Sequence, residues 1–392
     1  MPTEKIVTSP EDFRQRCETL KASPRLAFDM EFVPEHTYNP ELCLLQIATD
    51  DEVVAVDLLT VGDMTPFWEV VLDPERLVVV HAGSEELAAC FLHTGQTPSN
   101  IVDVQFAAGL AGYGYPLSYE NLVLKTIGTR VQSGETRTDW RKRPLTDRQL
   151  EYALDDVRCL LPACDHLMDK LSELGRSDWL RSEMEPIRHR IATRQNGERW
   201  RRIRGAGRLS RRELAVLQAV YSWREDRARS QDKPRGRIMR DDLLLEVARR
   251  KPSNPDSLGQ IRGMGDGAKS GWSKALLQAV ERAMAMSDDD CPKRPQASPT
   301  ADKQMVLKLV SALTSHIARE HSIAGELLAT NRDLRDFIEW GGKGGDPEQA
   351  PRLATGWRGE LCGARLKDLL AGRVKLSLAM TEAGDYEIVF EG

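Results

Sequence analysis

The feature of this sequence that most constrains its fold is a series of short apolar segments near the beginning, separated by turn-forming residues. Segments 25–32, 41–49 and 53–58 are rich in Val, Leu, Ile and Phe, and Pro/Asn or Asp/Asp residues lie between them. This spacing predicts an antiparallel meander of three strands. The elements expected after it are strands at 77–81 and 100–102, and helices at 84–92, 119–127 and 147–174. Strands followed by helices predict an α/β domain with a mixed sheet.

The rest of the chain predicts helical domains. Because 392 residues are more than one hydrophobic core usually serves, two or three domains are expected. The expected parts are an α/β domain with a charged, non-periodic connecting arm at 1–204, a small all-α bundle at 205–288, a Ser/Asp/Pro-rich linker at 289–300, and a second all-α bundle at 301–392. ELLATNRDL in the second bundle weakly repeats LLLEVARRKPSNPDSL in the first, and the end of the chain predicts a β-hairpin around a Gly-Asp turn. We expect the part up to residue 204 to fold without the rest.

The charge of the chain is unevenly distributed. Its net charge is −5, yet residues 201–251 contain 16 Lys and Arg against 7 Asp and Glu. A basic segment beside an acidic remainder indicates contact with a polyanion, although a solvated basic surface would have the same composition.

The sequence lacks the patterns of membrane spans, secretory signals and paired cysteines, and this predicts where the protein is located and the state of its cysteines. No apolar run approaches the roughly 20 residues of a membrane-spanning helix, and the first residues lack the layout of a secretory signal, so a cytoplasmic protein without membrane contact is expected. The seven cysteines are spaced singly and without a C-x-x-C pair. They are expected to be reduced thiols rather than disulfides or zinc ligands.

The segment Phe28–Phe32, FDMEF, is the strongest candidate for chemistry. Side chains alternate along a strand, so Asp29 and Glu31 share one face. Adjacent carboxylates repel each other unless cations lie between them. A charged strand face without a function is the alternative for these five residues taken alone.

Two further motifs place more acids on helices. Tyr152 and Asp156 are four residues apart on a strongly periodic helix and lie on one face of it, whereas Asp155 points about 100° away and is expected to face solvent. In His81–Leu87, HAGSEEL, a strand ends in a small-residue turn and a helix begins with two glutamates, which also favour the helix dipole. Taken singly, both motifs are also typical of ordinary surfaces.

Together, FDMEF, HAGSEEL and YALDD resemble the three exonuclease motifs of the tyrosine-containing branch of the DEDD superfamily. TDWRKRPLTDRQLEYALDDV is similar to the ribonuclease D family, and the resemblance covers about residues 5–200. It implies an RNase H-like exonuclease fold. It also implies that Asp29, Glu31 and Asp156 are metal ligands. By the same resemblance, Glu86 stands at the position of the fourth acid, and Tyr152 positions or deprotonates the attacking water.

The chemistry of phosphodiester hydrolysis agrees with this set. Two divalent ions about 3.5–4 Å apart can supply a hydroxide and neutralise the leaving oxygen, and oxygen ligands suit Mg²⁺ or Mn²⁺. Glu86 departs from the aspartate of the family. The extra methylene moves a carboxylate by about 1–1.5 Å, which displaces or weakens one metal site unless the backbone accommodates it.

Further residues are candidates for nucleic-acid contacts. Gln46, Trp140 and Arg141 could reach the substrate, with packing as the alternative for Trp140. The 205–288 bundle resembles the helicase and RNase D C-terminal domain, so its basic residues Arg208, Arg211 and Arg212 are expected to contact phosphates. GMGDGAKS is rejected as a nucleotide-binding P-loop, because Ala268 stands where the second glycine belongs.

The sequence therefore predicts a monomeric, metal-dependent 3′→5′ exoribonuclease without a nucleotide cofactor. It would bind RNA with a free 3′ end, such as tRNA and other structured precursors, and release nucleoside 5′-monophosphates. Two alternatives stay open. One is a 3′→5′ exonuclease for DNA, and the other is an RNA-binding protein whose nuclease site has weakened at Glu86.

Overall fold

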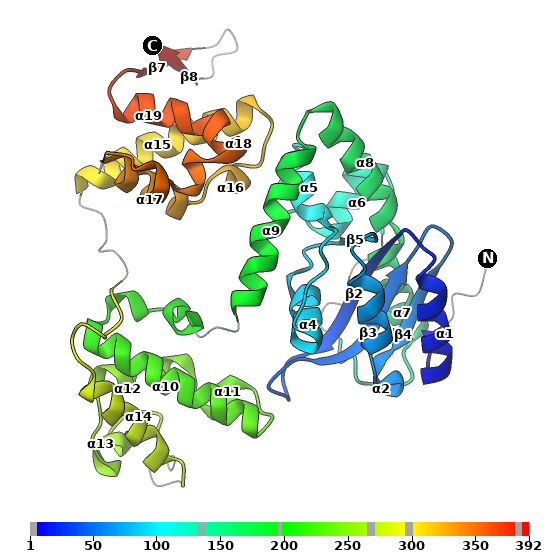
Figure 1. The fold of residues 1–392 in the computed structure, drawn as a ribbon, viewed down its shortest axis with the longest axis horizontal. Helices are drawn as coiled ribbons and strands as arrows, with labels where there is room; N and C mark the ends of the chain where they lie inside the picture. Colours follow the sequence, from blue (N-terminus) through cyan, green and yellow to red (C-terminus); the bar gives the residue numbers. More distant parts are fainter. Residues whose placement is uncertain are drawn as a thin grey trace.

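The computed structural model describes residues 6–131, 134, 138–194, 198–264, 271–294, 301–342, 344–380 and 386–391. The first domain is built on a six-stranded sheet in the order β1-β4-β3-β2-β5-β6 (Figure 1). Its strands are β1 (Ile6–Val7), β2 (Arg25–Val33), β3 (Glu41–Ala48), β4 (Val53–Asp57), β5 (Leu77–Val80) and β6 (Ile101–Asp103). β2, β3 and β4 pair antiparallel, and the other pairs are parallel. The prediction of a mixed sheet containing a meander is confirmed.

Helices connect and cover these strands. They are α1 (Pro10–Leu20), α2 (Leu58–Val61), α3 (Thr65–Val71), α4 (Ser84–Thr94), α5 (Val104–Leu110), α6 (Tyr119–Ile127), α7 (Asp147–Arg158), α8 (Leu160–Glu173) and α9 (Ser177–Arg194). The single helix predicted over 147–174 is wrong, because the chain breaks between α7 and α8 at Cys159. Pro162 accounts for the break, since its ring would clash with the carbonyl of Arg158 in a continuous helix.

The connecting arm is also different from the prediction. Residues 177–194 form helix α9, which packs on the core of the α/β domain rather than running as a charged, non-periodic segment. Its buried residues Leu180, Met184, Ile187 and Ile191 recur at helical spacing, which is the signal that the abundant charges of this segment obscured. Among the described residues, no helix is long and apolar enough to cross a membrane. All seven cysteines are unpaired, and six of them are buried.

The first helical bundle has a hydrophobic core of its own. It consists of α10 (Arg211–Ser230), α11 (Arg235–Ile238), α12 (Asp241–Arg250), α13 (Pro255–Gly259) and α14 (Ser273–Ala285). Leu217, Val220, Leu244 and Leu276 are fully buried within it. Parts of three predictions lie outside the described residues: the GMGDGAKS segment from residue 265 on, the end of the linker at 295–300, and the Gly-Asp turn of the hairpin at 381–385.

The second helical bundle shares its core with the α/β domain. It comprises α15 (Ala301–Glu320), α16 (Gly325–Leu328), α17 (Asn331–Gly342), α18 (Gly356–Arg358) and α19 (Ala364–Leu370), followed by a hairpin of β7 (Lys375–Met380) and β8 (Tyr386–Glu391). Gly109 of α5 lies so close to Leu327 that an added Cβ would come within 2.4 Å of its side chain, and the carbonyl of Gly109 accepts a hydrogen bond from Ala324 N. Ending the chain at residue 204 would expose this shared core, so we no longer expect that fragment to be stable.

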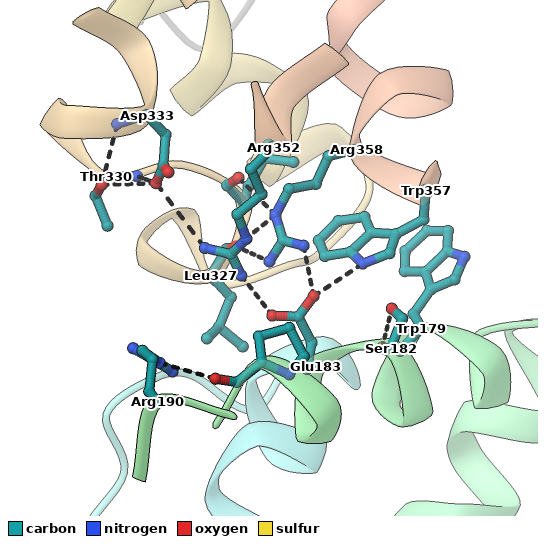
Figure 2. Close-up of polar contacts among 12 residues, drawn as sticks. Trp179, Ser182, Glu183, Arg190, Leu327, Thr330, Asp333, Arg352, Trp357 and Arg358 are labelled. Carbon is teal, nitrogen blue, oxygen red and sulfur yellow. Dashed lines mark hydrogen bonds and ion pairs between the residues drawn. The ribbon is translucent and has the colours of Figure 1, made fainter. Parts of the chain in front are cut away.

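A buried charge cluster joins the same two parts (Figure 2). Glu183 of α9 accepts hydrogen bonds from Arg352, Arg358 and the Trp357 indole, and the Trp179 and Trp357 rings stack with centroids 4.6 Å apart. Glu183 and Arg358 are each only 4% exposed. Burial acts to raise the pKa of Glu183, but the two arginines hold this pKa below its usual value.

The first helical bundle contacts the α/β domain through Tyr38, in the connection between β2 and β3. The Tyr38 hydroxyl donates to Glu225 at 3.1 Å, and its backbone N–H donates to Asp232 at 3.0 Å. The Arg235 guanidinium lies over the Tyr38 ring, 4.3 Å from its centroid. One tyrosine thereby links the strand connection to α10 and α11.

We expect Tyr38→Ala to speed amide hydrogen exchange in segments 34–40 and 232–238 by about tenfold or more. The lost cation–π contact and the lost hydrogen bond are each worth about 1 kcal/mol. Tyr38→Phe retains the ring and serves as the matched variant with a smaller effect. Unchanged exchange in Tyr38→Ala would show that other contacts hold the bundle in place.

Candidate active site

Two acidic side chains lie on one face of β2. Asp29 and Glu31 are partly exposed, whereas Phe28 and Met30 between them are buried in the main hydrophobic core. The acids therefore occupy the opposite face of the strand from this core. Helix α7 packs against β2, β3 and β4, and its residue Ala153 belongs to an apolar cluster with residues of these strands. The acids lie on the side of the sheet that α7 covers.

Helix α7 contributes a tyrosine and a third acid. A capping box between Thr146 and Gln149 starts the helix, as the sequence predicts. One turn and two turns further along, Tyr152 and Asp156 lie on one face of the helix, close enough that each side chain shifts the pKa of the other. The prediction that Asp155 faces solvent is wrong: Asp155 is 8% exposed and forms an ion pair with Arg158.

The fourth acid comes from the first turn of α4. Glu86 is 7% exposed, whereas its neighbour Glu85 is exposed to solvent. The turn before the helix is held by Asp103 at the end of β6, which accepts hydrogen bonds from the backbone N–H groups of Ala82 and Gly83 at 2.9 and 3.1 Å. Because Ala82 has a positive φ of 54°, these two hydrogen bonds stabilise a strained turn and fix where α4 begins.

Burial raises the pKa of all four carboxyl groups, and the charge of Asp29 adds to this effect at the other three. Burial raises the pKa of Asp29 to about 6, of Glu31 to about 9 and of Asp156 to about 8. The negative charge of Asp29 raises the pKa of Glu31 and Asp156 further. Burial, followed by the charge of Asp29, also raises the pKa of Glu86. The four acids from three elements thus interact as one cluster.

This donor set fits a hard divalent cation. Carboxylates that raise each other's pKa are stabilised by positive charge between them, and oxygen ligands are the ones that Mg²⁺ and Mn²⁺ prefer. In the described part of the chain, no three acidic, His or Cys side chains converge closely enough to hold an ion. The four acids therefore fit such an ion by their chemistry, and binding it would require their side chains to move closer together.

The sequence predicts that three residues of the α/β domain contact nucleic acid, and the structure places two of them inside the domain and one in an ion pair. Trp140 is 3% exposed and stacks beneath Tyr152 with centroids 6.2 Å apart, so the packing alternative is the one that the structure shows. Gln46 is fully buried in β3 and does not reach the surface. Arg141 forms a two-pronged ion pair with Asp139.

The basic residues at the start of α10 also have internal partners. Arg211 donates to the carbonyls of Asp289 and Cys291, and Arg212 donates to three carbonyls at the end of α14 and to Asp288. The prediction that these two side chains contact phosphates is corrected accordingly, since their donors anchor the end of the bundle. Arg208 is exposed and has no partner among the described residues.

Two supporting residues were missed in the sequence. Asp103, which holds the turn before α4, could have been found as a helix N-cap, because an aspartate at the end of a strand commonly caps the helix that follows. Arg143 pairs with the buried Asp57 and donates to the carbonyls of Cys43 and Trp140. It fastens the segment before α7 to the sheet and so places Trp140 under Tyr152. No local pattern predicts that Arg143 pairs with Asp57, which is 86 residues away.

Comparison with known proteins decides the family. Residues 5–172 match the 3′–5′ exonuclease family, residues 213–280 the HRDC domain, and residues 302–366 the C-terminal HRDC domain of ribonuclease D. A ribonuclease D of Gluconacetobacter diazotrophicus is 34% identical over 386 residues, which are 96% of this chain and 95% of that protein. The chain belongs to the ribonuclease D family.

Solved structures agree with this ribonuclease D assignment. The Escherichia coli ribonuclease D is 32% identical over 373 residues, and its crystal structure matches 94% of this chain with a TM-score of 0.81 at 30% identity. The match covers 99% of the Escherichia coli chain, and that protein is described as an exoribonuclease involved in structured RNA processing. As a member of this family, the chain is a 3′→5′ exoribonuclease with the RNase H-like fold and two HRDC bundles, and the family depends on divalent metal ions.

Proposed function

We propose that the carboxylates of Asp29, Glu31, Glu86 and Asp156 bind two divalent ions, Mg²⁺ or Mn²⁺. At this site the chain shortens structured RNA precursors such as tRNA from the 3′ end and releases nucleoside 5′-monophosphates. The observation that carries the proposal is the cluster itself: β2, α4 and α7 bring four mutually repelling acids together beside one tyrosine. When bound, such ions generate hydroxide at neutral pH and stabilise the leaving oxygen.

Tyr152 is assigned to positioning the attacking water. Burial and the charge of Asp156 raise the pKa of the Tyr152 phenol, so the phenol stays protonated. A protonated phenol orients a water but does not remove its proton. Stacking on the buried Trp140 supports this role, because it holds the ring in place.

RNA binding is assigned to exposed arginines of the segment before α10 and of the first bundle. Arg202, Arg204, Arg208 and Arg237 are exposed and have no partner among the described residues. Their guanidinium groups can therefore bind phosphates without first losing an internal hydrogen bond or ion pair, in contrast to Arg211 and Arg212. We further propose that the protein acts as a cytoplasmic monomer.

Matched 5′-labelled RNA and DNA of one sequence, each ending in a single-stranded 3′ tail, test the activity. With Mg²⁺ or Mn²⁺ we expect the RNA to shorten in single-nucleotide steps, with nucleoside 5′-monophosphates as products, and a chelator to stop the reaction. Equal shortening of DNA would favour the deoxyribonuclease alternative. Binding of RNA without shortening under any ion would favour a decayed site.

Glu86 gives a sharper prediction, because it replaces the shorter acid of the family. We expect Mn²⁺ to support more activity than Mg²⁺, and Glu86→Asp to keep or raise the Mg²⁺ rate. Glu86→Gln should lower the rate at least about tenfold, since it removes a charge that balances the cations. The exposed Glu85→Gln is the control and should change little. Wild-type rates in Glu86→Gln would remove Glu86 from the ligand set.

A further inference from the structure

A buried polar side chain lies inside the exonuclease domain without a partner. Gln46, in the middle of β3, is 0% exposed, and neither its Nε2 nor its Oε1 atom has a hydrogen-bond partner among the described residues. On the same face of the sheet, Leu44 and the paired residue Ala55 of β4 belong to an apolar cluster that also contains Leu154 of α7. An amide buried in this way destabilises the fold, so its presence needs a partner that the chain alone does not supply.

The position of Gln46 identifies where that partner would be. In the pairing of β2 with β3, Gln46 is directly opposite Asp29, and on its other side it pairs with Ala55 of β4. Side chains of directly opposite residues lie on the same face, with Cβ atoms about 4.5–5.5 Å apart. The amide therefore lies on the face of the acids, beside Asp29 and away from the outer surface that RNA would reach.

A carboxylate has about four acceptor positions on its two oxygens, so Asp29 can face an ion on one side and accept a hydrogen bond on the other. The strand register places Gln46, whose amide N–H groups are unused, directly opposite Asp29. A donor behind a ligating carboxylate fixes the orientation of that carboxylate.

We propose that Gln46 is a positioning residue of the ion-bound site: its Nε2 would donate to the Asp29 carboxylate and fix the orientation of that ligand. This inference rests on the proposed function of the four acids. Partners behind metal ligands fix the orientation of those ligands and typically change metal affinity 10- to 100-fold when lost. Gln46 would thus act through Asp29 and would not touch RNA.

Gln46→Met tests the proposal, since Met keeps the unbranched shape and removes both polar groups. Without ions, we expect the variant to melt at the same temperature as wild type or higher, because the unpartnered amide is gone. The Mn²⁺ dissociation constant, measured by calorimetry, should rise about 10- to 100-fold, with a smaller rise of the melting temperature on adding Mn²⁺. The kcat for RNA should fall, with KM unchanged.

Gln105→Met is the matched control, because the Gln105 amide donates to the carbonyl of Leu117 at 3.1 Å. It should melt lower than wild type and keep its Mn²⁺ affinity. The proposal is overturned if Gln46→Met behaves like Gln105→Met, or if only its KM for RNA rises. A wild-type chain that binds no Mn²⁺ and shortens no RNA would instead contradict the proposed function, and this outcome is distinct from failure of Gln46 alone.

Discussion

Asp29→Asn and Asp156→Asn are each expected to lower kcat for RNA shortening about 10³-fold or more, while RNA affinity stays within about threefold of wild type. A bound divalent ion contributes several kcal/mol to stabilisation of the transition state, and 1.36 kcal/mol corresponds to a factor of ten in rate. Both substitutions keep the size of the side chain and remove the charge that holds the ion. The exposed arginines proposed to bind RNA are far from either change in sequence and stay intact.

Single-turnover cleavage of a 5′-labelled RNA, paired with a binding titration in chelator, measures both quantities. Asp147→Asn is the matched control, because Asp147 is an exposed aspartate at the start of the same helix as Asp156. It should retain wild-type turnover. Turnover within tenfold of wild type in Asp29→Asn or Asp156→Asn would contradict the assignment of that acid as a ligand.

Glu183→Ala is expected to lower the free energy of unfolding by about 3–5 kcal/mol. The substitution leaves the buried Arg358 without its carboxylate, and an uncompensated buried charge has a cost of this size. The loss should also loosen the second HRDC bundle, because Arg352 and the Trp357 indole bind the same carboxylate (Figure 2). Urea denaturation followed by tryptophan fluorescence measures the effect.

Two variants sharpen this test. Glu185→Ala, two residues away on α9, removes an exposed glutamate that pairs with Arg188 and should change stability by no more than about 0.5 kcal/mol. Replacing Glu183 and Arg358 together by Met should recover much of the loss, since neither charge is then buried alone. A loss below about 1 kcal/mol in Glu183→Ala would show that water reaches the charge cluster. The cluster would then not hold the second helical bundle to the α/β domain.

Local patterns were sufficient for the sheet and for the assembly of the acidic motifs. The alternation in FDMEF places Asp29 and Glu31 on one face, and the helical spacing of Tyr152 and Asp156 does the same on α7. The mixed sheet then follows from the order of strands and helices. These features depend on neighbours within a few residues, which a sequence displays directly.

Two of the errors concern contacts between distant parts of the chain. Asp155 is expected in solvent from the sequence, but it is buried, and Tyr119, 36 residues away, donates to its carbonyl. The sequence predicts that Arg211 and Arg212 contact phosphates, although carbonyls at the end of α14 and in the segment after it accept hydrogen bonds from these side chains. Charge alone does not distinguish an arginine that anchors a loop from one that binds RNA.

The most direct test of the metal site is a Mn²⁺ titration of the full-length wild-type chain, followed by electron paramagnetic resonance of the free ion. The account predicts two bound Mn²⁺ per chain, and weaker binding or loss of at least one ion in Asp29→Asn, with Asp147→Asn unchanged. No bound Mn²⁺ in the wild type, or an identical titration in Asp29→Asn, would contradict the claim that these four acids form the catalytic metal site.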